Sequence, residues 1–168
     1  LEQMGVSVKD IRFLFLTHHH NDHCGLIDFL VRTNPNIRVV LNAACAGYMA
    51  TGMHFKHDNE AFSSTALQCI INIYSKLDRY WSDRFTPYFV RENDVFITQN
   101  NINTLHHLGI KGKIVMTPGH TEDSMSLIVG SVAFVGDAAR NMLNFIGMPY
   151  YPIIYCSKDV CLESWRRL

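Results

Sequence analysis

The chain has 168 residues and no formal net charge when its nine histidines are neutral, and 48% of its residues are hydrophobic. That length suits one domain with a sizeable core, and the apolar content excludes an intrinsically disordered protein. Lysine and arginine are scattered along the sequence, so nothing indicates the basic surface of a nucleic-acid-binding protein. We therefore expect a single folded domain over residues 1–168.

The sequence also argues against membrane insertion and against disulfides. Its longest apolar stretch, Met125–Val135, is too short and too often interrupted by serine and glycine to span a bilayer, and no signal peptide is visible. Five cysteines without paired spacing favour reduced thiols in a cytoplasmic protein, although Cys24 adjoins a candidate site. Because the chain opens on Leu1, amid what resembles the end of a helix, we expect it to be a fragment of a longer protein.

A short apolar and aromatic run, Ile11–Leu16, predicts a buried strand that leads directly into the sequence Thr-His-His-His-Asn-Asp-His-Cys-Gly. His18 and His20 are two residues apart, so in extended chain their side chains leave on the same side. Asp22 and His23 follow in a turn. Imidazole and carboxylate groups suit zinc and similar divalent ions. Four such groups within six residues indicate a metal site rather than a solvated loop or a purification-tag remnant.

Helices and strands alternate behind this site. A helix is expected at 26–33, a β-branched strand at 37–41 and a short helix at 43–49, which Asn42 would cap. The polar loop that follows contains four further polar groups: His54, His57, Asp58 and Glu60. Its histidines could reach a metal, but their spacing matches no site that we can define, so we do not assign them as ligands.

The clearest helix is predicted at 63–85, where apolar residues recur with the 3.6-residue period of a helix. These residues are Leu67, Ile70, Ile71, Tyr74, Leu77, Trp81 and Phe85. Two interpretations stay open. The helix could pack on the core, or it could form a cap over an active site and supply aromatic side chains to a substrate pocket.

Three strands are predicted in the second half of the chain: Lys113–Thr117, Ser124–Val129 and Val132–Val135. The last two would form a hairpin around Gly130-Ser131. His120 follows the first of these strands and Asp137 follows the third, so each candidate ligand lies at the C-terminal end of a strand. The remaining sequence predicts an irregular loop at 141–155 and a final helix at 158–167.

Three motifs, in this order, resemble those of the metallo-β-lactamase-fold hydrolases. Residues 18–23 are similar to the family's His-x-His-x-Asp-His signature, the Thr-Pro-Gly-His-Thr sequence at 117–121 to its second metal motif, and the Phe-Val-Gly-Asp-Ala sequence at 134–138 to its third. The resemblance implies an α/β (α+β) fold, a four-layer αββα sandwich. It also suggests a helical insertion at about 43–86.

The resemblance implies a binuclear metal site with six ligands. The first metal would be held by His18, His20 and His120, the second by Asp22 and His23, and both by a bridging Asp137. The family's last histidine ligand has no counterpart, because no histidine follows His120 in the sequence. The strands that usually precede the first motif are missing too, so we expect a fold truncated at both ends.

In such a site the metals are two Zn²⁺ ions per chain, with iron or manganese as alternatives. The resemblance implies that a zinc-bound hydroxide attacks the substrate while an ion polarises it. Asp22 would orient the hydroxide and manage its proton, which makes it the candidate catalytic residue. Thr121 and Asp123 are expected to support the ligating imidazoles from outside the metal site.

Asp137 helps to choose a branch of the family. The β-lactamases typically have Cys or Ser at the comparable position, whereas aspartate resembles the thioesterase, lactonase and phosphodiesterase branches. Our leading hypothesis is a zinc-dependent hydrolase of an ester-like bond, a thioester or a lactone, in a small-molecule substrate. The alternatives are a phosphodiesterase or nuclease of the same fold, a flavodiiron-like redox or other metal-binding protein, and an inactive family member. A homodimer is left open.

Overall fold

The computed structural model describes residues 2–77, 83–141, 150 and 152–168. Its first sheet is parallel and contains β1 (Phe13–Phe15), β2 (Arg38–Asn42) and β4 (Val95–Ile97) in the order β1-β2-β4. Parallel neighbours need a crossover connection, which α1 (Asn21–Cys24) and α2 (Ile27–Thr33) supply between β1 and β2. The centre of β2 is buried, as expected for a strand covered on both faces.

The second sheet is antiparallel and contains β5 (Lys113–Met116), β6 (Met125–Val129) and β7 (Val132–Phe134) in that order. The hairpin predicted between β6 and β7 is confirmed. Gly130 adopts a positive φ of 59° in its turn, a conformation that glycine reaches without steric penalty.

The remaining elements are short. They are the 3-10 helices η1 (Glu2–Met4), η2 (Val8–Asp10), η3 (Ala43–Cys45) and η4 (Gly136–Ala138), the helices α3 (Ala46–Thr51), α4 (Thr65–Leu77), α5 (Thr104–His107) and α6 (Lys158–Trp165), and the paired strands β3 (Ala61–Phe62) and β8 (Ile154–Tyr155). None of the helices in the described residues is long and apolar enough to cross a membrane.

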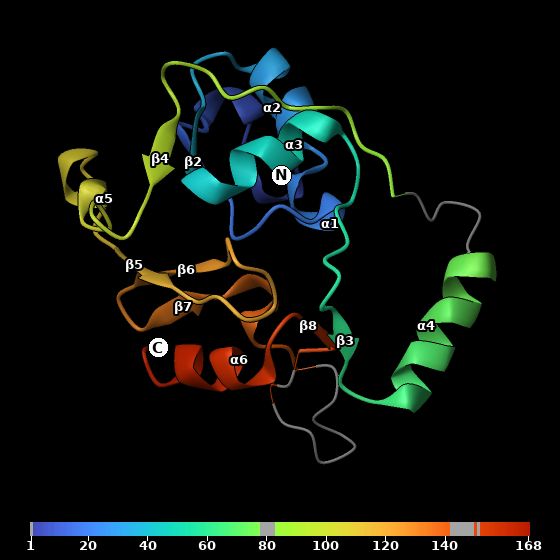
Figure 1. The fold of residues 1–168 in the computed structure, drawn as a ribbon. Coiled ribbons are helices and arrows are strands. Elements are labelled where there is room, and N and C mark those ends of the chain that lie inside the picture. Colours follow the sequence, from blue (N-terminus) through green and yellow to red (C-terminus); the bar gives the residue numbers. More distant parts are fainter. Residues whose placement is uncertain (1, 78–82, 142–149, 151) are drawn as a thin grey trace.

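The two sheets face one another with an apolar core between them. One cluster of buried residues combines side chains of the first sheet with side chains of the second: Val40, Val95, Ile97, Ile114, Met116 and Met125. The other cluster joins α2 and α3 to the outer face of the first sheet and includes Ile27, Val39 and Met49. Because α6 lies beyond the second sheet (Figure 1), the layers follow the expected αββα order.

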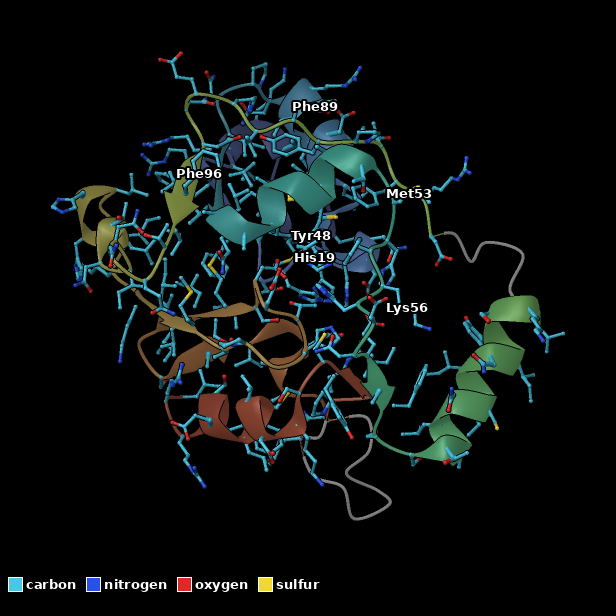
Figure 2. The ribbon with its side chains drawn as sticks, in the orientation of Figure 1. His19, Tyr48, Met53, Lys56, Phe89 and Phe96 are labelled. Atoms are coloured by element: carbon cyan, nitrogen blue, oxygen red, sulfur yellow. The ribbon has the colours of Figure 1, made fainter. Side chains whose placement is uncertain are left out.

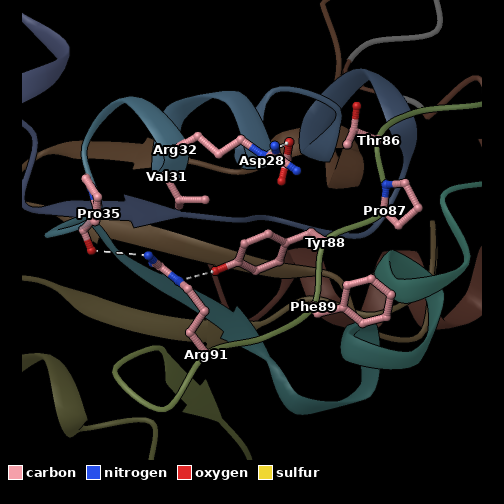
Figure 3. Close-up of a pocket in the computed structure, with 9 residues that line it drawn as sticks. All are labelled: Asp28, Val31, Arg32, Pro35, Thr86, Pro87, Tyr88, Phe89 and Arg91. Carbon is pink, nitrogen blue, oxygen red and sulfur yellow. Dashed lines mark hydrogen bonds and ion pairs between the residues drawn. The ribbon is translucent and has the colours of Figure 1, made fainter.

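The chain between α4 and β4 is fixed to the outer side of the first sheet by Arg91. Its guanidinium donates hydrogen bonds to the carbonyls of Pro35 (3.2 Å) and Ile37 and to the hydroxyl of Tyr88 (3.0 Å; Figure 3). Asp94 accepts from the Tyr88 hydroxyl at 2.5 Å. A cleft of about 510 Å³ lies against this segment and α2, but none of the predicted metal ligands lines it.

Helix α4 differs from its prediction. The expected helix at 63–85 is observed over Thr65–Leu77, and residues 78–82, with the predicted Trp81, lie outside the described residues. None of the 13 residues of α4 is buried, and its apolar face is open, with Ile70 61% exposed. Figure 1 shows the helix standing apart from both sheets. The interpretation that this helix packs on the core is therefore wrong, while the cap interpretation stays a prediction.

The loop expected at 141–155 falls mostly on residues 142–149 and 151, which lie outside the described residues. Its end is not irregular, because β8 pairs with β3 in an antiparallel register that places Phe62 opposite Ile154. Two-residue strands have too little alternation for a sequence pattern to reveal them.

Candidate metal centre

Three segments that are far apart in the sequence carry the candidate ligands, and each follows a strand. The first follows β1, where Leu16 N–H still donates to the Val40 carbonyl at 2.9 Å. The carbonyl of Thr17 then accepts from Met125 N–H of the second sheet, also at 2.9 Å. His20 forms the N-cap of α1. The ligand segment after β1 is thus tied to both sheets.

Two glycines allow the other two ligand segments to approach. At Gly119, directly before His120, a Cβ atom would lie 2.6 Å from the Cys161 sulfur, so only glycine lets α6 pack there. At Gly136, directly before Asp137, a Cβ atom would lie 2.6 Å from Oγ1 of Thr17. Gly136 also has φ +54°. The approach of the third segment to the first therefore depends on this glycine.

His18, His20 and His120 form one compact group, in which one ligand atom from each lies within 4.8 Å of the others. The Nε2 atom of His120 is 3.0 Å from Nδ1 of His20. All three are buried, and Nε2 of His18 has no hydrogen-bond partner among the described residues. Buried polar atoms are normally paired, so this nitrogen is free to bind a cation. Three buried imidazoles are a donor set that zinc prefers.

A second group, formed by His18, His23 and Asp137, meets the same 4.8 Å criterion. One carboxylate oxygen of Asp137 lies 3.3 Å from Nε2 of His23, and the other lies 3.7 Å from Nε2 of His120. Arg140 also contacts this carboxylate at 3.4 Å. The two oxygens of Asp137 therefore face histidines of both groups, which is the position that a bridging ligand requires.

Asp22 lies at the edge of this arrangement. Its carboxylate is 3.6 Å from Nε2 of His23, and its side chain is 62% exposed. It belongs to neither of the two groups that involve His18. The structure thus brings five of the six predicted ligands together and leaves Asp22 beside them, facing solvent.

The surroundings of His18, His20, His120 and Asp137 favour the protonation states that bind metals, whereas those of His23 favour its protonated form. Burial lowers the pKa of His18, His20 and His120, and neighbouring imidazoles lower the first two further. These rings are therefore neutral at physiological pH and offer lone pairs. For His23, burial is the largest single influence and lowers the pKa, but the hydrogen bond to Asp137 and the negative charges of Asp137 and Asp22 together raise it. Burial would raise the pKa of Asp137, yet the same bond and neighbouring charges lower it.

The sequence model of the Metallo-beta-lactamase superfamily matches residues 1–168. The chain belongs to this superfamily. A curated relative, the metallo-beta-lactamase fold-containing protein ST1585 of Sulfurisphaera tokodaii, is 26% identical over 167 residues, which cover 96% of this chain and 59% of the relative. The chain thus spans less than two thirds of the length of that relative.

Solved structures of superfamily members share the fold. The archaeal protein ST1585 from Sulfolobus tokodaii matches with a TM-score of 0.57 and 22% identity over 94% of this chain and 57% of that one. A Cronobacter sakazakii metallo-beta-lactamase with a HARLDQ motif has a TM-score of 0.55 and 20% identity over 99% and 57%. TTHA1623 in a di-iron-bound form has a TM-score of 0.52 and 16% identity over 99% and 66%.

Superfamily membership confirms the family resemblance and the αββα fold expected from the three motifs. Members of the superfamily are generally metal-dependent hydrolases, and this chain presents candidate histidine and aspartate ligands in the corresponding fold.

Groups outside the metal site orient three of the candidate ligands. Nδ1 of His120 donates to the carbonyl of Ile154 in β8 at 2.7 Å, which leaves its Nε2 with the lone pair. Oγ1 of Thr17 lies 3.2 Å from Nδ1 of His18 and 3.4 Å from Nδ1 of His23. None of these contacts was predicted. The contact of His120 with Ile154 joins segments 34 residues apart, whereas Thr17 contacts His18 and His23 within its own segment.

The outer partners predicted from sequence lie elsewhere. Asp123 pairs with His19, a residue that was not assigned as a ligand, with Oδ1 2.7 Å from Nδ1. The hydroxyl of Thr121 is 2.7 Å from that of Ser124. The prediction that they contact ligating imidazoles is therefore wrong. Cys24 does pack beside the site, where its thiol donates to the carbonyl of His19 at 3.1 Å and burial raises its pKa to about 12.

Sequence reasoning missed two side chains beside the cluster. His54 and Glu60 approach His20, and the three residues form a third group whose ligand atoms lie within 4.8 Å. Their spacing in the sequence gave no signal. His54 is held there by Oδ1 of Asn21, 3.1 Å from its Nδ1, and Glu60 directly precedes β3, which pairs with β8.

Proposed function

We propose that the chain is the metal-binding part of a zinc-dependent hydrolase that acts on an ester-like bond, either a thioester or a lactone. The observation that carries the proposal is the placement of Asp137 between the two histidine groups, 3.3 Å from His23 and 3.7 Å from His120. Such a carboxylate can hold two cations at once, as binuclear hydrolytic sites require.

The ligand assignment combines this geometry with the family resemblance, which supplies Asp22. His18, His20 and His120 would hold one cation, while His23 and Asp22 would hold the other. Zinc ions bound there would polarise the electrophilic carbonyl and lower the pKa of water towards neutrality. Imidazole and carboxylate ligands favour zinc, although iron and manganese accept similar donors.

The chain's own residues would supply positioning and proton transfer. Asp22 is the exposed carboxylate of the site, so it is placed to orient the attacking water and to accept its proton. Thr17 contacts both His18 and His23 and would hold their rings in register. His120 is held in the required tautomer by the carbonyl of Ile154.

The choice of bond rests on Asp137. An aspartate at this position favours the esterase-like branches of the superfamily over the antibiotic hydrolases. The formal net charge of zero supports a small-molecule substrate over a nucleic acid, which a basic surface would attract. Because the match covers only 59% of the curated relative, the activity of the whole protein is part of this proposal.

The test combines metal analysis with a substrate panel. The full-length protein should contain two zinc ions per chain and should hydrolyse thioesters or lactones in preference to β-lactams and phosphodiesters. His120→Ala should lose activity together with the zinc held by His18 and His20, whereas His107→Ala, which changes an exposed histidine, should keep both. Turnover of phosphodiesters alone would overturn the choice of bond, and iron without hydrolysis would favour a redox protein.

A further inference from the structure

The third group of metal-binding side chains lies beside the cluster and belongs to neither of its two halves. A ring nitrogen of His20, a ring nitrogen of His54 and a carboxylate oxygen of Glu60 lie within 4.8 Å of one another. His54 and Glu60 come from the connection between α3 and β3. Figure 2 shows this connection, on which Met53 and Lys56 are labelled, running past His19.

His20 has two chemically distinct sides. Its Nδ1 is 3.0 Å from Nε2 of His120 and so faces the cluster. Its Nε2 is buried and lacks a hydrogen-bond partner within the described part of the chain, in a residue that is only 5% exposed. An unpaired buried nitrogen is unfavourable unless a donor, an acceptor or a cation comes to it.

The other two side chains are already oriented. Nδ1 of His54 lies 3.1 Å from Oδ1 of Asn21, and since an amide oxygen only accepts hydrogen bonds, Nδ1 carries the proton. The lone pair of His54 is therefore on Nε2, the form that binds metals. Glu60 accepts a hydrogen bond from the backbone N–H of His57 at 2.9 Å, which fixes its carboxylate.

We propose that His20, His54 and Glu60 form an additional site for a divalent transition-metal ion, which we call the loop site. Two imidazoles and one carboxylate are a common donor set for zinc. A neutral imidazole has one lone pair, so the loop site and the cluster compete for His20 unless that ring loses its remaining proton. The loop site thus holds its ion chiefly through His54 and Glu60 whenever the cluster is occupied.

The first test follows the imidazole nitrogens of the unaltered chain by ¹⁵N NMR during a titration with Zn²⁺. Nε2 of His54 should move to the range of zinc-bound nitrogens, while the exposed His107 should stay at its metal-free position. A His54 resonance that does not move at any zinc concentration would overturn the proposal. This readout needs no substitution and no activity.

A matched pair of substitutions tests the carboxylate. Glu60→Gln keeps the shape and one acceptor oxygen but removes the charge, and it should weaken zinc binding at His54 by roughly ten-fold or more. Asp58→Asn removes the same charge from an exposed residue of the same loop and should leave that binding unchanged. Equal effects of the two substitutions would show that only the general charge of the loop matters, against the proposal.

His120→Ala separates direct binding from proximity. This variant removes a ligand of the cluster and releases His20 from competition, so the zinc-dependent shift of His54 should persist at equal or lower zinc concentration. Loss of the shift would mean that His54 merely senses an ion in the cluster, and the loop site would be abandoned. None of these outcomes depends on whether the protein hydrolyses an ester.

Discussion

Oδ1 of Asp123 lies 2.7 Å from Nδ1 of His19, and neither side chain is exposed to solvent. The two residues are 104 positions apart, so their contact joins the segment that follows β1 to the segment that contains His120. His19 also stacks on Tyr48 at a ring separation of 4.3 Å, which fixes it from a third direction. The pair is therefore the structural link between the ligand segments of the two sheets.

We expect Asp123→Ala to destabilise the fold by about 1–3 kcal/mol, because it leaves the buried Nδ1 of His19 without its hydrogen-bond partner. The free energy of unfolding, measured with denaturant, checks this value. Asp58→Ala, at an exposed position, should change it by less than about 0.5 kcal/mol. A loss of similar size in both variants would contradict a specific role for the buried pair.

Gly136→Ala should weaken zinc binding at the site as well as stability. The new Cβ would meet Thr17, which contacts both His18 and His23, so the third ligand segment must move away. Crowding of this kind typically destabilises by about 1–3 kcal/mol. Calorimetric titration with Zn²⁺ measures the affinity.

Gly130→Ala is the matched control for that substitution. Gly130 has a similar φ, +59° against +54°, but nothing lies within 4 Å of its added Cβ. It should therefore show the backbone strain alone, with zinc affinity unchanged. If both variants bind zinc equally well, the close approach at Gly136 does not position the ligands.

Asp22→Asn should lower kcat by roughly 100-fold or more at saturating zinc, since it removes the carboxylate proposed to accept a proton. Asparagine keeps an oxygen at the same place, so the metal content should be measured in the same sample. Full turnover with both ions bound would remove the catalytic role of Asp22 and leave it, at most, a ligand.

The Asp94 network gives a stability difference that depends on pH. Burial would raise the pKa of Asp94, but hydrogen bonds from Tyr88, Arg91 and Val39 lower it below its ordinary value of 3.8. A carboxyl with a lowered pKa stabilises the fold above its unfolded-state pKa, and this stabilisation is lost as the pH falls through its folded-state pKa. Its contribution is therefore complete at neutral pH and declines below about pH 3.8.

Asp94→Asn should be less stable than the unaltered chain by about 1–3 kcal/mol at pH 7. This difference should shrink as the pH falls below about 3.8. Denaturation at several pH values measures it. Glu92→Gln, at an exposed neighbouring position, should show little difference at any pH. A difference for Asp94→Asn that is constant with pH would assign the effect to shape instead of charge.

The parts of the fold that depend on neighbouring residues could be predicted from the sequence. The apolar run before the histidines predicted β1, and the Gly130 turn predicted the β6–β7 hairpin. The three ligand motifs could be found because they resemble the family's motifs and occur in the same order. The placement of Asp137 between the histidine groups agrees with the bridging role that the resemblance implied.

The parts that depend on distant residues could not be predicted. The period of α4 correctly indicated a helix, yet a period reports an apolar face and not what covers it. The partner of Asp123 lies 104 residues away, and His54 is held beside His20 by Asn21 of a different segment. Local pattern carries no information about such contacts.

The carbonyl of Ile154 accepts a hydrogen bond from Nδ1 of His120, and the strand that contains Ile154 pairs with Phe62. Binding of a metal to the buried imidazoles should therefore restrict the motion of residues 53–62, because the peptide group of Ile154 connects the two. Protease cleavage within that segment should slow when zinc is added and quicken when a chelator removes it. The digestion pattern would then report whether zinc occupies the buried histidines.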